Sequence, residues 1–390
     1  MNMRIRIVQL IPGLIVGDLG GGLELYSIRL AQTLDPQLFH ITIANLWRFD
    51  RPIEQYWEAE LRASGIEVVY GAPFAQHMVH SVIKAWRGLH PQVQHLHPHI
   101  IHAHGEYAGL VGLALAAGRT PFIRTCHTTL EFPRHLQIRK IANLLYPALA
   151  TVQVGVSDAV VAHLSRHPLA RILHRPIYRI HNGIDLRRVL NQRTGKNLRQ
   201  ELGLAPDTIL FGLVGRLTEQ KGIPDALEAF ALARKRIPNA ILLIVGSGYG
   251  NKPKTFIERA EQLRISQYVF WLGARPDAID IIANLDVLVS PSLWEGLPTV
   301  ILEAMAVGTP VVATDIPGTR ELLQHEQTGL LVPPRKPEAL AQAMEKLAFD
   351  KTLAHGLATA AREQVKHFTI EPAARQYEHL YLQVLRANTR

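Results

Sequence analysis

Residues 292–314 read SLWEGLPTVILEAMAVGTPVVAT, which predicts a loop, a helix and a buried strand in close succession. Pro298 suits the first position of the helix, because its ring presets φ and its missing N–H would have no partner there. Gly308 favours the left-handed conformation that ends a helix, and Pro310 stops the helix from continuing. With the apolar run at 286–290, the stretch predicts a strand–helix–strand unit of a parallel sheet.

The same stretch predicts a binding site for an anion. The start of the helix leaves the amides of Thr299 and Val300 without partners inside the helix, and such amides attract anions. Glu295 lies in the loop before the helix, and Glu303 lies a turn or more inside it. We therefore expect a site that holds a phosphate between two acidic side chains.

The alternation of short apolar runs with longer amphipathic stretches occurs twice along the chain, and it is typical of βαβ units in a parallel sheet. In the first half we expect strands near 4–10, 39–44, 66–70, 99–103, 121–125, 151–156 and 177–180, and helices near 23–34, 53–63, 76–89, 106–116, 134–149 and 157–165. In the second half we expect strands near 209–214, 240–245, 268–272, 286–290, 310–313 and 329–332, and helices near 224–236, 254–264, 276–284, 298–307 and 337–348. The polar segment 187–200 is the predicted linker. The fold class is therefore α/β, with two doubly wound Rossmann-like domains that bind ligands at the carboxyl ends of their strands.

The composition indicates a large globular protein. The 390 residues suffice for two domains, each with its own core, and a hydrophobic content of 47% is ordinary. A single cysteine, Cys126, excludes a disulfide within one chain. No apolar run approaches the roughly 20 residues that span a bilayer. Because residues 1–12 read as a buried strand rather than a cleavable signal, we expect a cytoplasmic protein.

The net charge of +9 lies mainly in the first half, where residues 1–190 carry 19 Lys and Arg against 12 Asp and Glu. A one-sided basic surface favours an anionic partner such as phosphate-bearing lipid or nucleic acid, although ordinary solvated Lys and Arg side chains would produce the same excess. The charge indicates a class of partner without identifying one.

Two strand-to-helix loops carry the residues that could bind phosphate. The first strand leads into a glycine turn with Gly21 and Gly22, which would let a phosphate or sugar approach the backbone closely or would simply make a tight turn. This turn is neither a dinucleotide fingerprint nor a P-loop. In the second half, the strand at 209–214 is followed by Arg216 and Lys221, two cations that can converge on a diphosphate.

These residues resemble a known family, the retaining GT-B glycosyltransferases of family 4 (glycosyltransferase group 1). The motifs that carry the resemblance occur in the expected order over about residues 5–335: Gly20-Gly21-Gly22-x-Glu24, His102-Ala-His104, Thr125-x-His127, Val156-Ser157, Asn182-Gly183-Ile184-Asp185, Val214-Gly-Arg216 with Lys221-Gly222, Leu243-Ile-Val-Gly246-x-Gly248, and Glu295-x7-Glu303. The resemblance implies an N-terminal acceptor-binding domain at 1–190 and a nucleotide-sugar-binding domain at 191–370, facing each other across a cleft. It also implies that a C-terminal helix at 371–390 crosses back to the first domain.

The resemblance assigns the donor's nucleotide to residues of the second domain. Arg216 and Lys221 would hold the diphosphate, with help from the helix start at Thr299 and Val300. Glu303 would accept hydrogen bonds from the ribose.

The resemblance places other residues around the transferred sugar. Glu295, with the backbone of Gly296 and Leu297, would face the donor sugar, and His127 would lie near the reacting centre. The turn at 21–22 would touch the phosphate or the acceptor. The chain departs from the family pattern at His99, where relatives commonly carry an Asp before the strand.

The implied reaction moves a hexose from a nucleotide sugar, most often a UDP-sugar in this family, to a lipid-linked or cell-surface glycan, with retention of configuration. Cations placed where charge grows on the leaving diphosphate would lower the barrier. No Asp-x-Asp sequence is present to hold a metal ion, so we expect neither a metal nor another cofactor. A double displacement with Glu295 as nucleophile is the weaker alternative, because no acid partner for it is apparent.

The crowded histidines between His90 and His104 could in principle bind a metal, but their spacing favours core and loop positions. The stretch 134–149 combines Arg and Lys with an apolar stripe, which predicts either a helix that covers the sheet or peripheral attachment to an anionic membrane. Because the first half is basic, we expect attachment.

Three other classes of protein are consistent with parts of the pattern. A sugar-nucleotide epimerase could share the architecture but would need a full acid–base set around a sugar ring. A nicotinamide oxidoreductase would need the dinucleotide fingerprint, and a nucleic-acid-binding protein would explain only the charge. None of the three accounts for Arg216, Lys221, Glu295 and Glu303 together.

Overall fold

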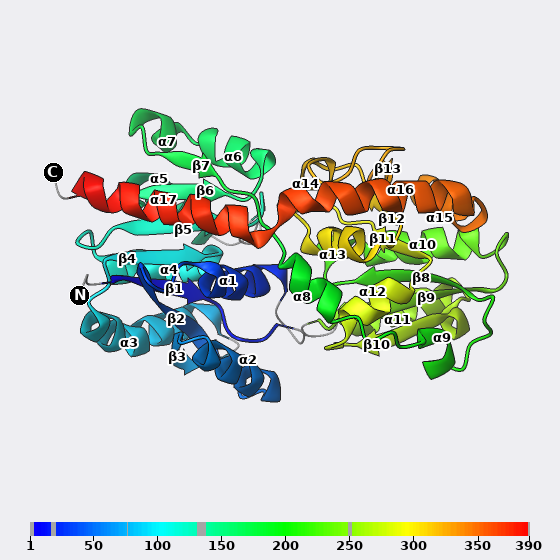
Figure 1. Ribbon diagram of the computed structural model, residues 1–390, viewed down its shortest axis with the longest axis horizontal. Helices are drawn as coiled ribbons and strands as arrows, with labels where there is room; N and C mark the ends of the chain where they lie inside the picture. The colour runs from blue at the N-terminus through cyan, green and yellow to red at the C-terminus, as the bar shows by residue number, and fades with distance from the viewer. Residues whose placement is uncertain (1–3, 17–20, 76, 131–137, 249–251, 389–390) are drawn as a thin grey trace. The chain divides into compact units, whose positions relative to one another are not determined.

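The computed structural model describes residues 4–16, 21–75, 77–130, 138–248 and 252–388. Two compact units are present (Figure 1). The first comprises residues 4–16, 22–183 and 370–388, and the second comprises Gly21 and residues 184–369. The chain therefore passes into the second unit after Gly183 rather than near residue 190.

The first unit is built on a seven-stranded parallel sheet with the strand order β3-β2-β1-β4-β5-β6-β7. The strands are β1 (Ile5–Ile11), β2 (Phe39–Arg48), β3 (Glu67–Pro73), β4 (Ile100–His104), β5 (Phe122–Cys126), β6 (Val152–Gly155) and β7 (Ile177–Arg179). The helices are α1 (Gly22–Thr33), α2 (Pro52–Ala63), α3 (Met78–Leu96), α4 (Glu106–Ala116), α5 (Ile138–Leu149), α6 (Asp158–Ser165), α7 (Pro168–Ile172) and α17 (Ile370–Asn388). The strand order reverses between β1 and β4, which is the point where such sheets bind ligands.

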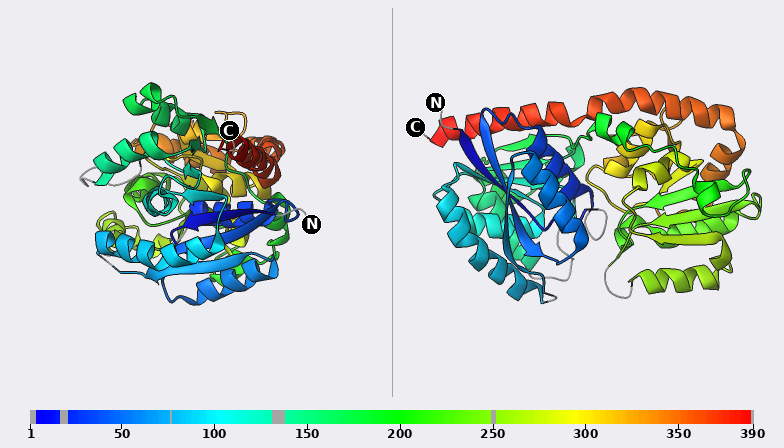
Figure 2. Two further views of the ribbon diagram at one scale, coloured as in Figure 1. Left: turned by 90° about the vertical axis from the view of Figure 1, so that its left-hand side faces the viewer. Right: turned by 60° about the horizontal axis from the view of Figure 1, so that its bottom comes forward.

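The last helix, α17, is part of the first unit. In Figure 2 (right) this red helix and the dark blue β1, from opposite ends of the chain, lie in the same unit. The apolar stripe of α17 packs into the core that β1, β2 and α1 form. Ile370, Tyr377 and Tyr381 of α17 are almost completely buried there. The predicted return of a C-terminal helix to the N-terminal domain is confirmed.

The second unit has a six-stranded parallel sheet with the order β10-β9-β8-β11-β12-β13. The strands are β8 (Ile209–Val214), β9 (Ala240–Val245), β10 (Val269–Gly273), β11 (Val287–Ser290), β12 (Val311–Thr314) and β13 (Leu330–Val332). The helices are α8 (Leu186–Asn191), α9 (Leu198–Glu201), η1 (Glu219–Lys221), α10 (Ile223–Ala233), α11 (Lys252–Gln262), η2 (Ser266–Tyr268), α12 (Ala278–Asn284), α13 (Thr299–Val307), α14 (Pro317–Arg320), α15 (Pro337–Phe349), α16 (Lys351–Gln364) and η3 (Val365–Phe368). All six residues of β9 are buried, as expected of a strand covered on both faces.

The α/β fold class with two Rossmann-like units is confirmed, and every strand predicted from periodicity is present within a few residues of its expected place. Helix α3 runs beyond its predicted end at residue 89 and continues through Pro91 to Leu96. The helix continues because its buried stripe of Ala85, Leu89 and Val93 packs on the sheet on both sides of the proline.

The segment predicted as a linker, 187–200, is instead held against the second unit. It contains most of α8 and part of α9. The amide and hydroxyl of Thr194 both donate hydrogen bonds to the carboxylate of Asp280, at 2.7 Å each. The polar composition of 187–200 correctly indicated a segment at the surface. The segment is not a free linker, however, because hydrogen bonds from Thr194 attach it to α12.

Within the described ranges, no helix combines the length and the hydropathy needed to span a bilayer.

Candidate active site

The predicted phosphate-binding residues of the second unit lie on loops that start where its strand order reverses. Strands β8 and β11 are neighbours, although β9 and β10 lie between them in sequence. The loops that leave their carboxyl ends carry Arg216 and Lys221 on one side and Glu295 on the other. This is the position at which open parallel sheets place ligands.

Glycine is required where these two loops approach each other. Gly222 has a φ of 61°, and a Cβ atom there would lie 2.0 Å from the carbonyl oxygen of Pro291. A side chain at this position would therefore separate the β8–α10 loop from the end of β11. The sequence signal Lys221-Gly222 reflects this close backbone approach.

The close approach brings Lys221 and Glu295 into a partly buried ion pair. Lys221 Nζ lies 2.7 Å from Glu295 Oε1, and the side chains are only 16% and 9% exposed. The hydroxyl of Ser292 donates to the same oxygen at 2.8 Å, and Nε2 of Gln220 donates to Oε2 at 3.1 Å. Both carboxylate oxygens are thus held by donors, so Glu295 is fixed in position.

Sequence reasoning identified Lys221 and Glu295 but not their pairing, and it missed Ser292 and Gln220. The signal available for these two was their spacing, since each lies within three residues of a predicted site residue. Arg216 is exposed, and none of the described residues forms an ion pair or hydrogen bond with its guanidinium. The structure therefore brings Lys221 to Glu295 but leaves Arg216 outside this group.

Helix α13 begins beside the ion pair. Pro298 is the N-cap, with a φ of −73°, so the helix begins at Thr299, one residue later than predicted. Gly296 and Leu297 are buried, and a Cβ atom on Gly318 would lie 2.6 Å from the carbonyl oxygen of Gly296, so α14 supports the turn. The first amides, of Thr299 and Val300, belong to the set that an α-helix leaves without internal partners.

Gly308 ends α13 with a φ of 81°, as predicted. Glu303 lies inside α13, one turn after its start at Thr299. No described residue forms a hydrogen bond with its carboxyl group. Burial raises the pKa of Glu303 to about 7, while the charge of Lys221 acts in the opposite direction. Such a carboxyl is prepared to receive hydrogen bonds from a ligand that replaces its lost hydration.

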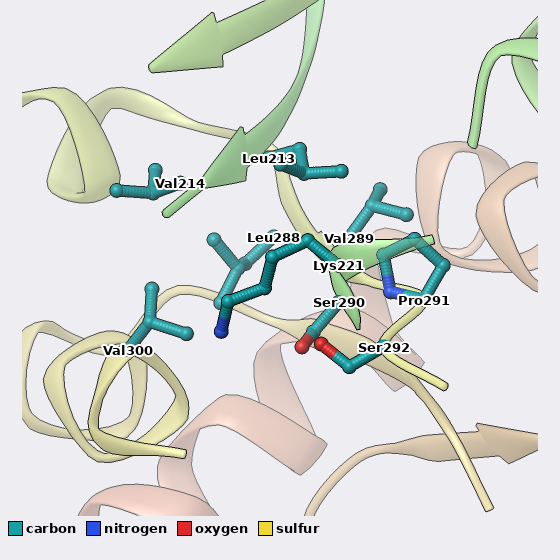
Figure 3. A pocket seen from close by; sticks show the side chains of 9 residues that line it. All are labelled: Leu213, Val214, Lys221, Leu288, Val289, Ser290, Pro291, Ser292 and Val300. Atoms are coloured by element: carbon teal, nitrogen blue, oxygen red, sulfur yellow. The ribbon is translucent and has the colours of Figure 1, made fainter. Parts of the chain in front are cut away.

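A small pocket lies against this group. Figure 3 shows Lys221 among its lining residues, with the amino end of the side chain directed to the side where Val300 lies. The other lining residues are Leu213, Val214, Leu288, Val289, Ser290, Pro291 and Ser292. The ends of β8 and β11 and the first turn of α13 therefore enclose one concave site with a cation in it.

The first unit has a group of histidines at the carboxyl ends of β4 and β5. His104 ends β4 and His127 directly follows β5, and Nδ1 of His104 lies 3.1 Å from Nε2 of His127. Burial lowers the pKa of His127 to about 3, helped by the charge of Arg124, and it lowers the pKa of His104 well below its usual value. His127 was a predicted site residue, whereas His104 belonged to the crowded histidines predicted to take core and loop positions.

The structure describes the end of the glycine turn, at Gly21 and Gly22. Gly22 is the first residue of α1 and Gly21 precedes it, but residues 17–20 lie outside the described ranges. Residues 134–137 of the predicted amphipathic helix also lie outside them. Among the described residues, no group of three or more His, Cys, Asp or Glu side chains is placed to hold a metal ion.

Two family descriptions match the chain, one in each half. Residues 20–188 match "Glycosyltransferase Family 4", and residues 195–364 match "Glycosyl transferases group 1". The D-inositol 3-phosphate glycosyltransferase of Corynebacterium urealyticum is 36% identical over 49% of this chain, and the match spans 46% of that protein. The UDP-Gal:alpha-D-GlcNAc-diphosphoundecaprenol alpha-1,3-galactosyltransferase of Escherichia coli is 24% identical over 98% of both chains.

The fold is also that of solved glycosyltransferases. Sucrose-phosphate synthase from Thermosynechococcus elongatus superposes with a TM-score of 0.82 at 22% identity, over 98% of this chain and 100% of that one. Anabaena Alr3699/HepE, solved with UDP-glucose, superposes with a TM-score of 0.78 at 23% identity, over 97% and 100%. At these identities the likeness establishes the fold alone. The chain belongs to glycosyltransferase family 4 and is a GT-B glycosyltransferase.

Proposed function

We propose that this enzyme transfers a hexose from a UDP-sugar to a lipid-linked or cell-surface glycan acceptor, with retention of configuration and without a metal ion. The observation that carries the proposal is the Lys221–Glu295 pair at the first turn of α13, with the half-buried Glu303 in the same helix. This group offers a cation and unpaired amides to a diphosphate, and a carboxyl group to a ribose.

The donor would bind with its diphosphate at the start of α13. Lys221 and the amides of Thr299 and Val300 would contact phosphate oxygens, and Arg216, whose side chain is exposed, would reach the same anion from solvent. Glu303 would accept hydrogen bonds from ribose hydroxyls, for which its ionised form is the better acceptor.

The reaction would break the bond between the anomeric carbon and a phosphate oxygen. The acceptor hydroxyl would attack the same face of the sugar, and its proton would pass to an oxygen of the departing diphosphate. Negative charge grows on that diphosphate, where Lys221 and the helix start stabilise it without reorganising. Glu295, held by Ser292 and Gln220, would orient the donor sugar through its hydroxyl groups.

The UDP-sugar and the acceptor are proposed from the relatives. HepE was solved with UDP-glucose, and the name of the E. coli relative specifies UDP-Gal and a diphosphoundecaprenol-linked acceptor. A lipid-linked acceptor also agrees with the basic first half of the chain.

Thermal-shift measurements with UDP, GDP, ADP and their sugars test the donor site. A nucleotide at 100 times its Kd should stabilise the protein by about 2.7 kcal/mol. Lys221→Ala and Arg216→Ala should each remove most of that shift, whereas Glu295→Gln should keep the shift and lose transfer. Unchanged stabilisation by nucleotide in both cation variants would refute the phosphate assignment.

Peripheral attachment to an anionic membrane is part of the proposal, and an exposed surface on the first unit supports it. Helices α5 and α7 are in contact. Leu144 and Leu149 on α5, Ile172 on α7 and Leu173, which directly follows α7, are 44% to 69% exposed. Residues 159–184 contain four Arg and no Asp or Glu. Exposed apolar side chains in a segment rich in Arg suit the surface of an anionic bilayer, although Arg179 is paired with Asp158.

Flotation with vesicles tests the attachment. The protein should float with vesicles that contain anionic lipid at low salt and not with zwitterionic vesicles. Ile172→Asp combined with Leu173→Asp should abolish flotation. Val79→Asp should not, although the side chain of Val79 on α3 is about as exposed as that of Ile172. Equal flotation of both variants would exclude this surface.

A further inference from the structure

The histidine group of the first unit contains two kinds of histidine. His102 has both ring nitrogens bonded, Nδ1 to the hydroxyl of Tyr381 at 2.7 Å and Nε2 to the hydroxyl of Thr125 at 2.8 Å. Thr125 is bonded in turn to the hydroxyl of Tyr377 at 2.9 Å. His102 is therefore a satisfied core residue that anchors α17 to β4 and β5.

His104 and His127 use only one nitrogen each. Their single shared hydrogen bond joins His104 Nδ1 to His127 Nε2, and the remaining atoms, His104 Nε2 and His127 Nδ1, are buried without a partner among the described residues. The ring of Tyr26 packs edge-on against both, with centroids 6.3 Å and 5.7 Å away. Buried nitrogens without partners are costly in a core, and their presence here points to a ligand.

Both rings are neutral in this environment. Burial and the neighbouring imidazoles hold the pKa of His104 low, and burial holds the pKa of His127 low. Two neutral imidazoles that share one hydrogen bond have two arrangements, because either ring can supply the shared proton. If His104 donates the shared proton, its Nε2 carries no hydrogen and Nδ1 of His127 carries one. If His127 donates, Nδ1 of His127 carries no hydrogen and Nε2 of His104 carries one.

Burial distinguishes the two arrangements. His104 is completely buried, whereas His127 is only half-buried at the end of its strand. A buried N–H without an acceptor is rarer in proteins than a bare acceptor. The unpartnered N–H is therefore better placed on His127, the less buried residue of the two, and the bare nitrogen on His104.

We propose that His104 is a positioning residue that donates its Nδ1–H to His127 and so holds His127 as the Nδ1–H tautomer, which donates a hydrogen bond to an oxygen of the bound sugar substrate. This inference deepens the proposed function and rests on it for the identity of the ligand. His104 itself does not touch the substrate.

Nitrogen-15 NMR of the protein labelled on histidine tests the tautomer directly, because the two-bond couplings of the ring differ between Nδ1–H and Nε2–H forms. The signals of His127 are identified by their loss in His127→Asn. The wild-type protein should show a single Nδ1–H tautomer for His127, and an Nε2–H tautomer would overturn the proposal. This measurement needs no activity, so its outcome is independent of the proposed reaction.

Two variants of His104 separate positioning from packing. In His104→Asn the amide nitrogen lies near the place of Nδ1 and can still donate, so His127 should keep its tautomer and kcat should stay within about threefold. In His104→Leu no donor remains, so His127 should populate both tautomers and kcat should fall by about 10- to 100-fold with UDP affinity unchanged.

Tyr381→Phe is the matched control, since it removes a hydrogen bond in the same core that does not involve His127. It should lower thermal stability while the tautomer of His127 stays the same. If His104→Leu leaves the tautomer and kcat unchanged, or if Tyr381→Phe alters the tautomer as much as His104→Leu does, His104 has no positioning role. If the wild-type protein does not bind UDP, the proposed function is contradicted, but the result on the tautomer of His127 remains valid.

Discussion

Glu303→Gln is expected to stabilise the ligand-free protein at alkaline pH. Burial raises the pKa of Glu303 from 4.5 to about 7, more than the charge of Lys221 lowers it. A raised pKa means that the neutral carboxyl favours folding, so its contribution is fully present below pH 4.5 and is lost as the pH rises through 7. Ionising the carboxyl in place costs about 3 kcal/mol. Glutamine does not ionise, and so it avoids this cost.

Urea unfolding followed by tryptophan fluorescence, to which Trp271 and Trp294 of the same unit contribute, measures the effect. The variant should exceed the wild type by about 3 kcal/mol at pH 8.5 and by only a few tenths of a kcal/mol at pH 4.5. An equal difference at the two pH values would refute the reasoning, because a pH-independent change reflects packing. A variant less stable than the wild type at pH 8.5 would show that Lys221 compensates the buried charge.

The same titration should appear in nucleotide binding. Ribose hydroxyls donate more strongly to a carboxylate than to a neutral carboxyl. The affinity of the wild-type protein for UDP should therefore fall more steeply below pH 7 than the affinity of Glu303→Gln, because the titration of the terminal phosphate of UDP contributes equally to both proteins. Calorimetric titration with UDP at pH 6 and 8 provides the comparison.

Other expectations follow from the same contacts. Lys221→Met should destabilise the protein by about 3 kcal/mol because it leaves the carboxylate of Glu295 without its cation. Adding Glu295→Gln should recover most of this loss, and additive losses in a double-mutant cycle would show that the two side chains are not coupled. Gly222→Ala should lower stability by more than about 2 kcal/mol, because its Cβ would overlap a backbone carbonyl at 2.0 Å, whereas Gly203→Ala, with a similar φ and open space, should cost only about 1 kcal/mol in thermal unfolding. Tyr381→Phe should cost about 1 to 2 kcal/mol because it leaves a nitrogen of His102 unbonded, and a neutral change in urea unfolding would contradict that hydrogen bond.

Several parts of the site were predictable because they depend on local sequence. The positions of Lys221, Glu295 and Glu303 after strands β8 and β11 followed from periodicity and from the punctuation by Gly222, Pro298 and Gly308. Parallel strands place their carboxyl ends at one edge, so residues after neighbouring strands converge. Only the distances between the side chains were beyond this reasoning.

Other parts depended on contacts between distant segments, which no local pattern contains. The bonds from Tyr377 and Tyr381 to Thr125 and His102 join residues that are more than 250 positions apart. The pairing of His104 with His127 requires β4 and β5 to be neighbours in register. The alternation His102-Ala-His104 marked a strand but did not distinguish the satisfied core histidine from the unsatisfied one.

The sequence by itself determined the two parallel sheets, the family and the loops that carry the site, because hydrophobic period and glycine or proline punctuation act within a few residues. The tertiary structure alone decided which of these polar groups are paired. Lys221 reaches Glu295, Glu303 has no hydrogen bond from a described residue, and His104 is linked to His127. Pairing depends on packing across the sheet, where strand order and burial, rather than neighbours in the chain, set the distance between charges.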